Sequence, residues 1–154
     1  MPKENTKTIA TNKKAFHDYF VDESYEAGIE LAGTEVKSLR QGRVNLKDSW
    51  CAIENGELLL KGCHISLYDF GNIFNRDPVR ERRLLMHKRE IMRLLGYVKQ
   101  DGYSIIPLSL YFKGSRVKVQ VGLCRGKKLY DKRADMAAKS AKRDIQRTMK
   151  EQNR

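Results

Sequence analysis

The stretch SIIPLSLYFKGSRVKVQVGL, Ser104–Leu123, decides the fold class of this chain. It predicts two strands, Ser104–Phe112 and Arg116–Leu123, joined at Lys113-Gly114-Ser115. Apolar residues alternate along the second strand, at Val117, Val119, Val121 and Leu123, while Lys118 and Gln120 fall on the other face. A period of two is typical of a strand with one buried face. The chain is therefore expected to build its core on β-strands.

Strand patterns recur earlier in the chain. Residues 24–31 alternate apolar positions with Glu26 and Glu30. Asn55-Gly56 stands between two apolar runs, which is a strong hairpin signal. The further segments with a strand pattern are Tyr19–Val21, Ser49–Ile53, Glu57–Lys61 and His64–Tyr68.

Two segments have a helical pattern instead. Residues 33–42 predict a short helix that Thr34 caps and Gly42 ends. Residues 79–95 predict a longer helix that ends at Gly96. Its apolar residues recur at helical spacing, at Leu84, Ile91 and Leu95.

Many short antiparallel strands with few helices favour a closed barrel. We expect a mainly β fold: a small closed antiparallel OB-like barrel with two or three flanking helices and a basic C-terminal tail. A split α+β sandwich is the alternative, and the pattern alone does not separate the two.

The charge is large and unevenly distributed. The 154 residues carry a formal net charge of +12. Residues 15–75 have a net charge of −5, whereas residues 125–154 have +7. A strongly basic chain favours phosphate-rich partners. We expect a basic arm at 1–14, a barrel at 15–124 that binds nucleic acid and a basic tail at 125–154, in a cytoplasmic protein without a membrane partner.

Catalytic motifs are missing from the sequence. It contains no H-E-x-x-H, no G-x-S-x-G and no G-x-x-x-x-G-K-[ST]. Cys51, Cys63 and Cys124 form no C-x-x-C pair, so we expect buried thiols rather than a metal or redox site. We expect no catalytic residues, no metal and no cofactor. A metal nuclease using Glu26, Glu30 and Glu35 remains a minor alternative, as does an intrinsic ribosomal protein.

An ordered set of motifs resembles the SmpB family. The resemblance begins at Ile9–Ala15 and extends to about Lys150, nearly the whole chain. Its most specific run is Glu35-Val36-Lys37-Ser38-Leu39-Arg40. Other matching pieces are Asp48-Ser49-Trp50, Asp77-Pro78, Arg83-Leu84-Leu85, Pro107–Tyr111, Gly126-Lys127-Lys128 and Asp131-Lys132-Arg133.

The resemblance implies an OB-like, non-enzymatic protein that binds the tRNA-like domain of transfer-messenger RNA. It implies delivery of that RNA to stalled ribosomes for trans-translation, with the tail in the vacant mRNA channel in place of codon–anticodon pairing. DNA is not an expected partner. The implied RNA-binding residues are Asn12, Lys13, Glu26 and Leu85. The implied tail residues that act on ribosomal RNA are Arg125, Lys127, Lys128, Asp131, Lys132, Arg133 and Met149.

Some expectations rest on the residues themselves. A carboxylate such as Glu26 repels phosphate but accepts hydrogen bonds from base amino groups.

Alanines and other apolar residues recur through 134–149 at intervals of three and four, so the tail is expected to be disordered alone and helical when bound. Many members of the family that the chain resembles have Ile at the position of Thr148, and some have Trp at the position of Ala141. The tail of this chain is therefore expected to have a smaller apolar anchor. The aromatic residues considered for base stacking are Tyr19, Tyr25, Trp50 and Tyr68.

Overall fold

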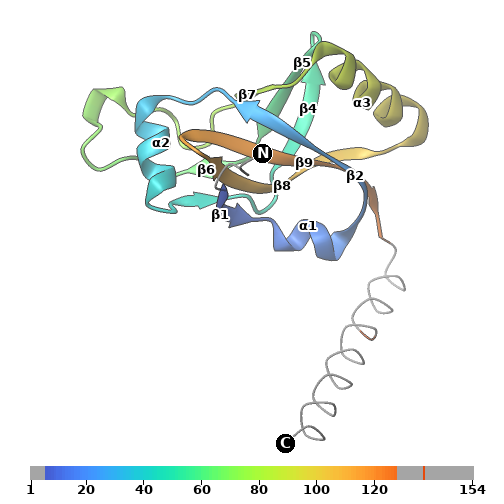
Figure 1. Cartoon of the computed structure of the whole chain (residues 1–154), viewed down its shortest axis with the longest axis horizontal. Coiled ribbons are helices and arrows are strands. Elements are labelled where there is room, and N and C mark those ends of the chain that lie inside the picture. Colours follow the sequence, from blue (N-terminus) through green and yellow to red (C-terminus); the bar gives the residue numbers. More distant parts are fainter. Residues whose placement is uncertain (1–5, 128–136, 138–154) are drawn as a thin grey trace, which may run out of the picture.

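The computed structural model describes residues 6–127 and residue 137. Strands dominate this part of the chain, and three α-helices and a short 3-10 helix accompany them (Figure 1). The elements are β1 Thr6–Thr11, α1 Lys13–Asp18, β2 Tyr19–Ile29, α2 Gly33–Arg40, β3 Val44–Asn45, β4 Trp50–Glu54, β5 Glu57–Lys61, β6 His64–Ile65, η1 Asn72–Phe74, β7 Arg82–Leu85, α3 Lys88–Asp101, β8 Ser104–Lys113 and β9 Arg116–Gly126.

The strands form an antiparallel sheet whose hydrogen-bond pairing runs in a ring. The order is β8-β4-β5-β7-β2-β9, and β9 pairs back onto β8. β1 adds to the outer part of β8, from Thr6 opposite Lys113 to Thr11 opposite Ser109. β4 meets β8 at a single residue pair, Cys51 opposite Ile105. The mainly β, antiparallel prediction is confirmed.

The predicted hairpins are present. β8 pairs with β9 from Ser104 opposite Cys124 to Lys113 opposite Arg116, and Val117, Val119, Val121 and Leu123 are buried as the alternation requires. β4 and β5 form the hairpin around Asn55-Gly56, where both residues have positive φ. The three cysteines are buried and unpaired, as expected.

Two strand predictions need adjusting. The expected strand 64–68 is confirmed only at His64–Ile65, which form β6. β6 pairs with β3, and this two-residue pairing ends at Ile65. Part of the expected basic arm, Thr6–Thr11, lies in the sheet as β1, and β9 continues to Gly126, beyond the expected end of the barrel.

The predicted helix at 79–95 is confirmed only for residues 88–95, and its first half is wrong. Residues 82–85 form β7, and α3 covers Lys88–Asp101. Gly96 lies inside α3, and the helix ends at Gly102, whose φ of 68° is the left-handed conformation that glycine adopts easily. In β7 the exposure alternates, with Arg82 and Leu84 buried and Arg83 and Leu85 exposed.

The predicted helix at 33–42 is confirmed as α2, but its cap differs. The N-cap is Ala32 rather than Thr34, and the Glu35 carboxylate accepts a hydrogen bond from the Ala32 amide at 2.9 Å. Gly42 follows the helix with a φ of 70°. Figure 1 shows α2 and α3 at opposite ends of the strands.

A buried ion cluster joins α2 to β7. Arg82 is fully buried, and its Nε donates to Glu35 Oε2 at 2.6 Å. The Arg80 Nε also donates to the Glu35 carboxylate, at 3.1 Å. Burial would raise the pKa of Glu35, but these guanidinium groups and the Ala32 amide outweigh it and lower the pKa.

The remaining donors of Arg82 bind main-chain carbonyls. Its Nη1 donates to the carbonyls of Cys63 and Arg80, at 2.8 and 3.1 Å, and its Nη2 donates to that of Pro78 at 2.9 Å. One side chain therefore fixes α2, the segment before β6 and the approach to β7.

Candidate nucleic-acid interface

The structure brings two of the expected RNA-binding residues, Glu26 and Leu85, to the wall of one cavity. This cavity has a volume of about 420 Å³ and lies where β2, β7 and the start of α3 meet. Leu85 stands opposite Gly28 of β2, and its Cβ lies only 3.3 Å from where a Cβ on Gly28 would be. The glycine therefore lets Leu85 lie directly over β2. Leu85 remains 47% exposed, so its side chain is accessible from solvent.

Glu26 is held in place from β8. The Tyr111 hydroxyl donates a hydrogen bond to Glu26 Oε2, and Lys113 Nζ lies 3.2 Å from Oε1. The bond from Tyr111, followed by those from Lys113 and the charge of Lys118, keeps the pKa of Glu26 below its ordinary value against the opposing effect of burial. The side chain is 40% exposed. An ionised, oriented and accessible acceptor therefore faces solvent beside Leu85.

Basic side chains share the same cavity. Lys118 on β9 pairs in register with Gly28, and Arg83 precedes Leu84 on β7. Arg83 Nη1 lies 3.6 Å from Glu30 Oε1, and Arg83 Nε lies 3.7 Å from Glu57 Oε1. Sequence reasoning placed Lys118 on the face away from the core but did not single it out for RNA. Its cross-strand position relative to Glu26 is visible only once β2 and β9 are paired.

Asn12 has a structural role in the fold. It is 5% exposed, its Nδ2 donates to the Pro107 carbonyl at 2.9 Å, and its Oδ1 accepts from the Ala15 amide at 3.2 Å. Its own amide donates to the Leu108 carbonyl at 2.8 Å. Asn12 therefore caps α1 and ties it to β8, whereas Lys13 is exposed in the first turn of α1.

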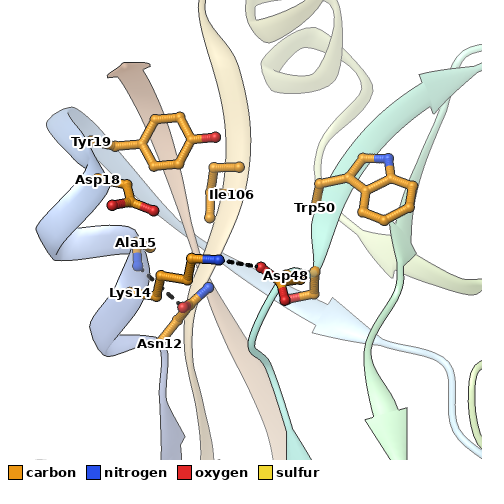
Figure 2. Close-up of a pocket in the computed structure, with 9 residues that line it drawn as sticks. Asn12, Lys14, Ala15, Asp18, Tyr19, Asp48, Trp50 and Ile106 are labelled. Carbon is orange, nitrogen blue, oxygen red and sulfur yellow. Dashed lines mark hydrogen bonds and ion pairs between the residues drawn. The ribbon is translucent and has the colours of Figure 1, made fainter. Parts of the chain in front are cut away.

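A second cavity, of about 270 Å³, lies beside Asn12 (Figure 2). Lys14 Nζ forms an ion pair with Asp48 at 2.6 Å, and Figure 2 shows the rings of Tyr19 and Trp50 on either side of Ile106. Trp50 is 47% exposed, and its role in base stacking stays a prediction. Asn12 thus lies beside a cavity lined by Tyr19 and Trp50, apart from the cavity that Glu26 and Leu85 line, and Lys13 lines neither of the two.

The first tail residues are fixed to the body of the protein. Arg125 binds Asp22 at 2.8 and 3.2 Å, and its guanidinium lies over the Phe20 ring, 5.4 Å from the centroid. The Lys127 amide donates to the Asp18 carbonyl at 2.8 Å, and its Nζ also lies over Phe20. The other expected tail residues lie outside the described residues: Lys128, Asp131, Lys132, Arg133 and Met149.

Two kinds of feature are absent from the described part of the chain. Residues 6–127 and residue 137 contain no group of three or more His, Cys, Asp or Glu side chains arranged to hold a metal ion. Over the same residues, no helix is long and apolar enough to cross a membrane.

Comparison with known proteins identifies the family. The family model described as SmpB protein matches residues 9–151. The chain is 62% identical to the SsrA-binding protein of Clostridium kluyveri, over 99% of this chain and 97% of the relative. It is 58% identical to that of Ruminiclostridium cellulolyticum over the full length of both.

A solved chain is also similar, described as "tmRNA-SmpB: a journey to the center of the bacterial ribosome". Its TM-score is 0.66 at 50% identity, and the match covers 78% of this chain and 85% of that one. With a family match across nearly the whole sequence and relatives of this identity, the chain belongs to the SmpB family.

Proposed function

We propose that this protein binds the tRNA-like domain of transfer-messenger RNA and acts with it on the ribosome in trans-translation. The observation that carries the proposal is the cavity where Glu26, Leu85 and Lys118 meet, in a chain whose relatives are named SsrA-binding proteins. These three side chains suit one unstacked nucleotide. The Glu26 carboxylate can accept hydrogen bonds from the edge of the base, Leu85 can cover the face of the base, and Lys118 can bind the phosphate. The protein is a binding protein and not an enzyme, and in this proposal it acts on ribosomes in the cytoplasm.

The ring of strands acts in this proposal as an OB-like barrel. Barrels of this kind present strand faces to nucleic acid and surround them with basic loops. The pairing of β9 with β8 supports this assignment, since it completes the ring from β2 round to β4.

The tail has a separate role in the proposal. We propose that the tail, residues 125–154, leaves the body at its first residues and reaches into the vacant mRNA channel of a stalled ribosome, where it substitutes for codon–anticodon pairing. Their net charge of +7 supports contact with ribosomal RNA. The anchoring of Arg125 on Asp22 and Phe20 gives the tail a fixed point of departure from the sheet.

Two measurements test the proposal. Sequencing of the RNA that co-purifies with the tagged protein should return one dominant transfer-messenger RNA, and a mixture without it would refute the binding partner. A chain truncated after Lys132 should keep the RNA affinity of the full chain and fail to support peptide tagging on stalled ribosomes. Full tagging activity from the truncated chain would contradict the role of the tail.

A further inference from the structure

The segment between β6 and β7, residues 66–79, gathers exposed apolar side chains, and we call it the apolar loop. Nine large hydrophobic residues are exposed in the described part of the chain, and the loop holds five of them: Leu67, Phe70, Ile73, Phe74 and Val79. Ile73 is 88% exposed, Phe70 is 80% exposed and Phe74 is 71% exposed. Single apolar residues scattered over a surface are normal, but a group of them on one loop marks an interaction surface.

The apolar loop is closed at its base and attached to α2. The Ile65 amide donates to the Pro78 carbonyl at 2.9 Å, so the two ends of the loop meet. The Ser66 carbonyl accepts a hydrogen bond from the Ser38 hydroxyl on α2 at 2.7 Å. Figure 1 shows the loop projecting beyond α2, at the end of the strands away from α3. Compact loops with joined ends are frequently functional.

Contacts inside the loop fix its shape. The Asn75 side chain accepts a hydrogen bond from the Tyr68 amide and donates one to the Tyr68 carbonyl, both at 2.9 Å. The Phe74 carbonyl accepts from the Thr34 hydroxyl on α2 at 3.1 Å. The Phe70 ring packs edge-on against the Tyr68 ring, with the centroids 5.7 Å apart. The exposed apolar side chains therefore stand on a preformed surface, and a partner does not have to order it on binding.

The charge of the apolar loop favours a protein over RNA as its partner. Its charged residues are Asp69, Arg76 and Asp77, a net charge of −1 in a chain of +12. Both carboxylates are exposed, and Asp69 Oδ1 lies 3.3 Å from Arg43 Nη1 at the edge of the loop. RNA phosphates would meet these two carboxylates, whereas phosphate binding requires a surplus of Lys and Arg. An apolar surface with acidic residues at its rim is instead complementary to an apolar hollow with a basic rim.

We propose that the apolar loop docks into an apolar hollow on a basic protein of the ribosome. This docking rests on the proposed function, which brings the chain to the ribosome. Proteins that bind ribosomal RNA carry a surplus of Lys and Arg, which attracts an acidic rim. Ile73 and Phe74 are the side chains that enter the hollow, and Asp69 and Asp77 face its basic rim.

Site-specific photocrosslinking identifies what lies against the loop. The full-length chain is bound with transfer-messenger RNA to purified ribosomes that are stalled on a message without a stop codon. The photoreactive residue p-benzoylphenylalanine replaces Ile73, or Met92 in the matched control. Met92 is also apolar and exposed, and it lies on α3 at the other end of the strands. Nuclease digestion and mass spectrometry then distinguish crosslinks to RNA from crosslinks to protein.

Three variants test whether the contact contributes to binding. The double substitution Ile73→Ser, Phe74→Ser removes two side chains that are mostly exposed, so the fold should not depend on them. Asn75→Ala keeps the apolar side chains and removes the two hydrogen bonds to Tyr68. Met92→Ser is the control. Circular dichroism and thermal melting establish that each variant folds, and its affinities for transfer-messenger RNA and for stalled ribosomes are measured separately.

The expected result is a crosslink from position 73 to one ribosomal protein that position 92 does not give. The double serine variant should bind stalled ribosomes roughly 10- to 100-fold more weakly, because apolar residues at the centre of an interface carry much of the affinity. Asn75→Ala should weaken the same binding roughly three- to tenfold, because the loop must then be ordered on docking. Met92→Ser should bind stalled ribosomes as the wild type does, and none of the three should lose affinity for transfer-messenger RNA.

Other occupants of the loop give different results. A crosslink from position 73 to RNA, to a second copy of the chain or to its own tail would overturn docking on a ribosomal protein, as would the absence of any crosslink. Wild-type ribosome affinity of the double serine variant would overturn it too. Co-sedimentation of the wild-type chain with phosphatidylglycerol vesicles that the double serine variant loses would assign the loop to a lipid surface instead.

The two affinity measurements separate this docking from the proposed function. Asn75→Ala indistinguishable from the wild type would overturn the role of the preformed loop shape. If the wild-type chain binds transfer-messenger RNA and stalled ribosomes but the loop substitutions change nothing, only the docking is refuted. If the wild-type chain binds neither, the proposed function itself is refuted, and the docking with it.

Discussion

Replacing Arg82 by methionine should destabilise the fold more than any surface charge change. The methionine keeps much of the apolar volume but leaves the Glu35 carboxylate, 4% exposed as a residue, with Arg80 as its remaining guanidinium partner. It also removes the donors to the carbonyls of Cys63 and Pro78. Breaking a buried ion pair by removing one partner costs about 3–5 kcal/mol. A domain of this size loses about 2–4 °C of Tm per kcal/mol, so the expected drop is about 6–20 °C.

Urea unfolding followed by circular dichroism measures this effect. The matched control is Arg83→Met on the same strand, because the Arg83 side chain is 49% exposed and its carboxylate contacts are at 3.6 and 3.7 Å. Exposed pairs contribute about 0–1 kcal/mol, so the control should stay within that range. An Arg82→Met variant that loses less than about 1 kcal/mol would show that the buried ion cluster does not hold α2 and β7 together.

Three further predictions concern the fold. Gly122→Ala would place a Cβ 2.8 Å from Leu108 Cδ1 in the core and should cost about 1–3 kcal/mol in urea unfolding, whereas Gly126→Ala meets nothing within 4 Å and should be neutral. Asn12→Ala removes a helix cap and the bond to β8 and should lower stability by about 1–2 kcal/mol, measured in the same assay; an RNA affinity that falls while stability stays unchanged would instead make it a direct contact. Because the pKa of Glu35 is lowered in the fold, its stabilising effect should be complete above its ordinary pKa of about 4.3 and disappear as the pH falls through the lowered value. The Tm difference between wild type and Glu35→Gln should therefore become smaller as the pH is lowered from about 6 to about 3. A difference that stays constant over this range would contradict a stabilising role of the ionised Glu35 carboxylate.

The strands that alternate strictly were predictable from sequence, and the segment around β7 was not. In β9 every second residue is apolar and buried, so local pattern and tertiary environment agree. In β7 the buried positions hold Arg82 and Leu84, and arginine is almost never fully buried without a partner. That partner, Glu35, is 47 residues away in the sequence. Leu84 and Ile91 are seven residues apart, which is a helical spacing, but Leu84 lies in β7 and Ile91 lies in α3.

The candidate site was predictable in part for a similar reason. The resemblance selected Glu26 and Leu85, and the structure brings them to one cavity. Tyr111 and Lys113 could not be linked to Glu26 from the sequence, because they lie 85 and 87 residues away and reach it across another strand. Asn12 was expected as an RNA contact, and its polar atoms are occupied by the helix cap and by β8.

The long pairing of β2 with β9 has a consequence for the synthesis of this protein. Tyr19, near the start of the chain, stands opposite Gly126, and the register continues from there to Gly28 opposite Lys118. A growing chain that still lacks residues 116–126 has one edge of β2 and one edge of β8 without their strand partner, because β9 is hydrogen-bonded to both. Unpaired strand edges of this kind invite association with other chains. The sheet can therefore close only after nearly all of the described body has been made.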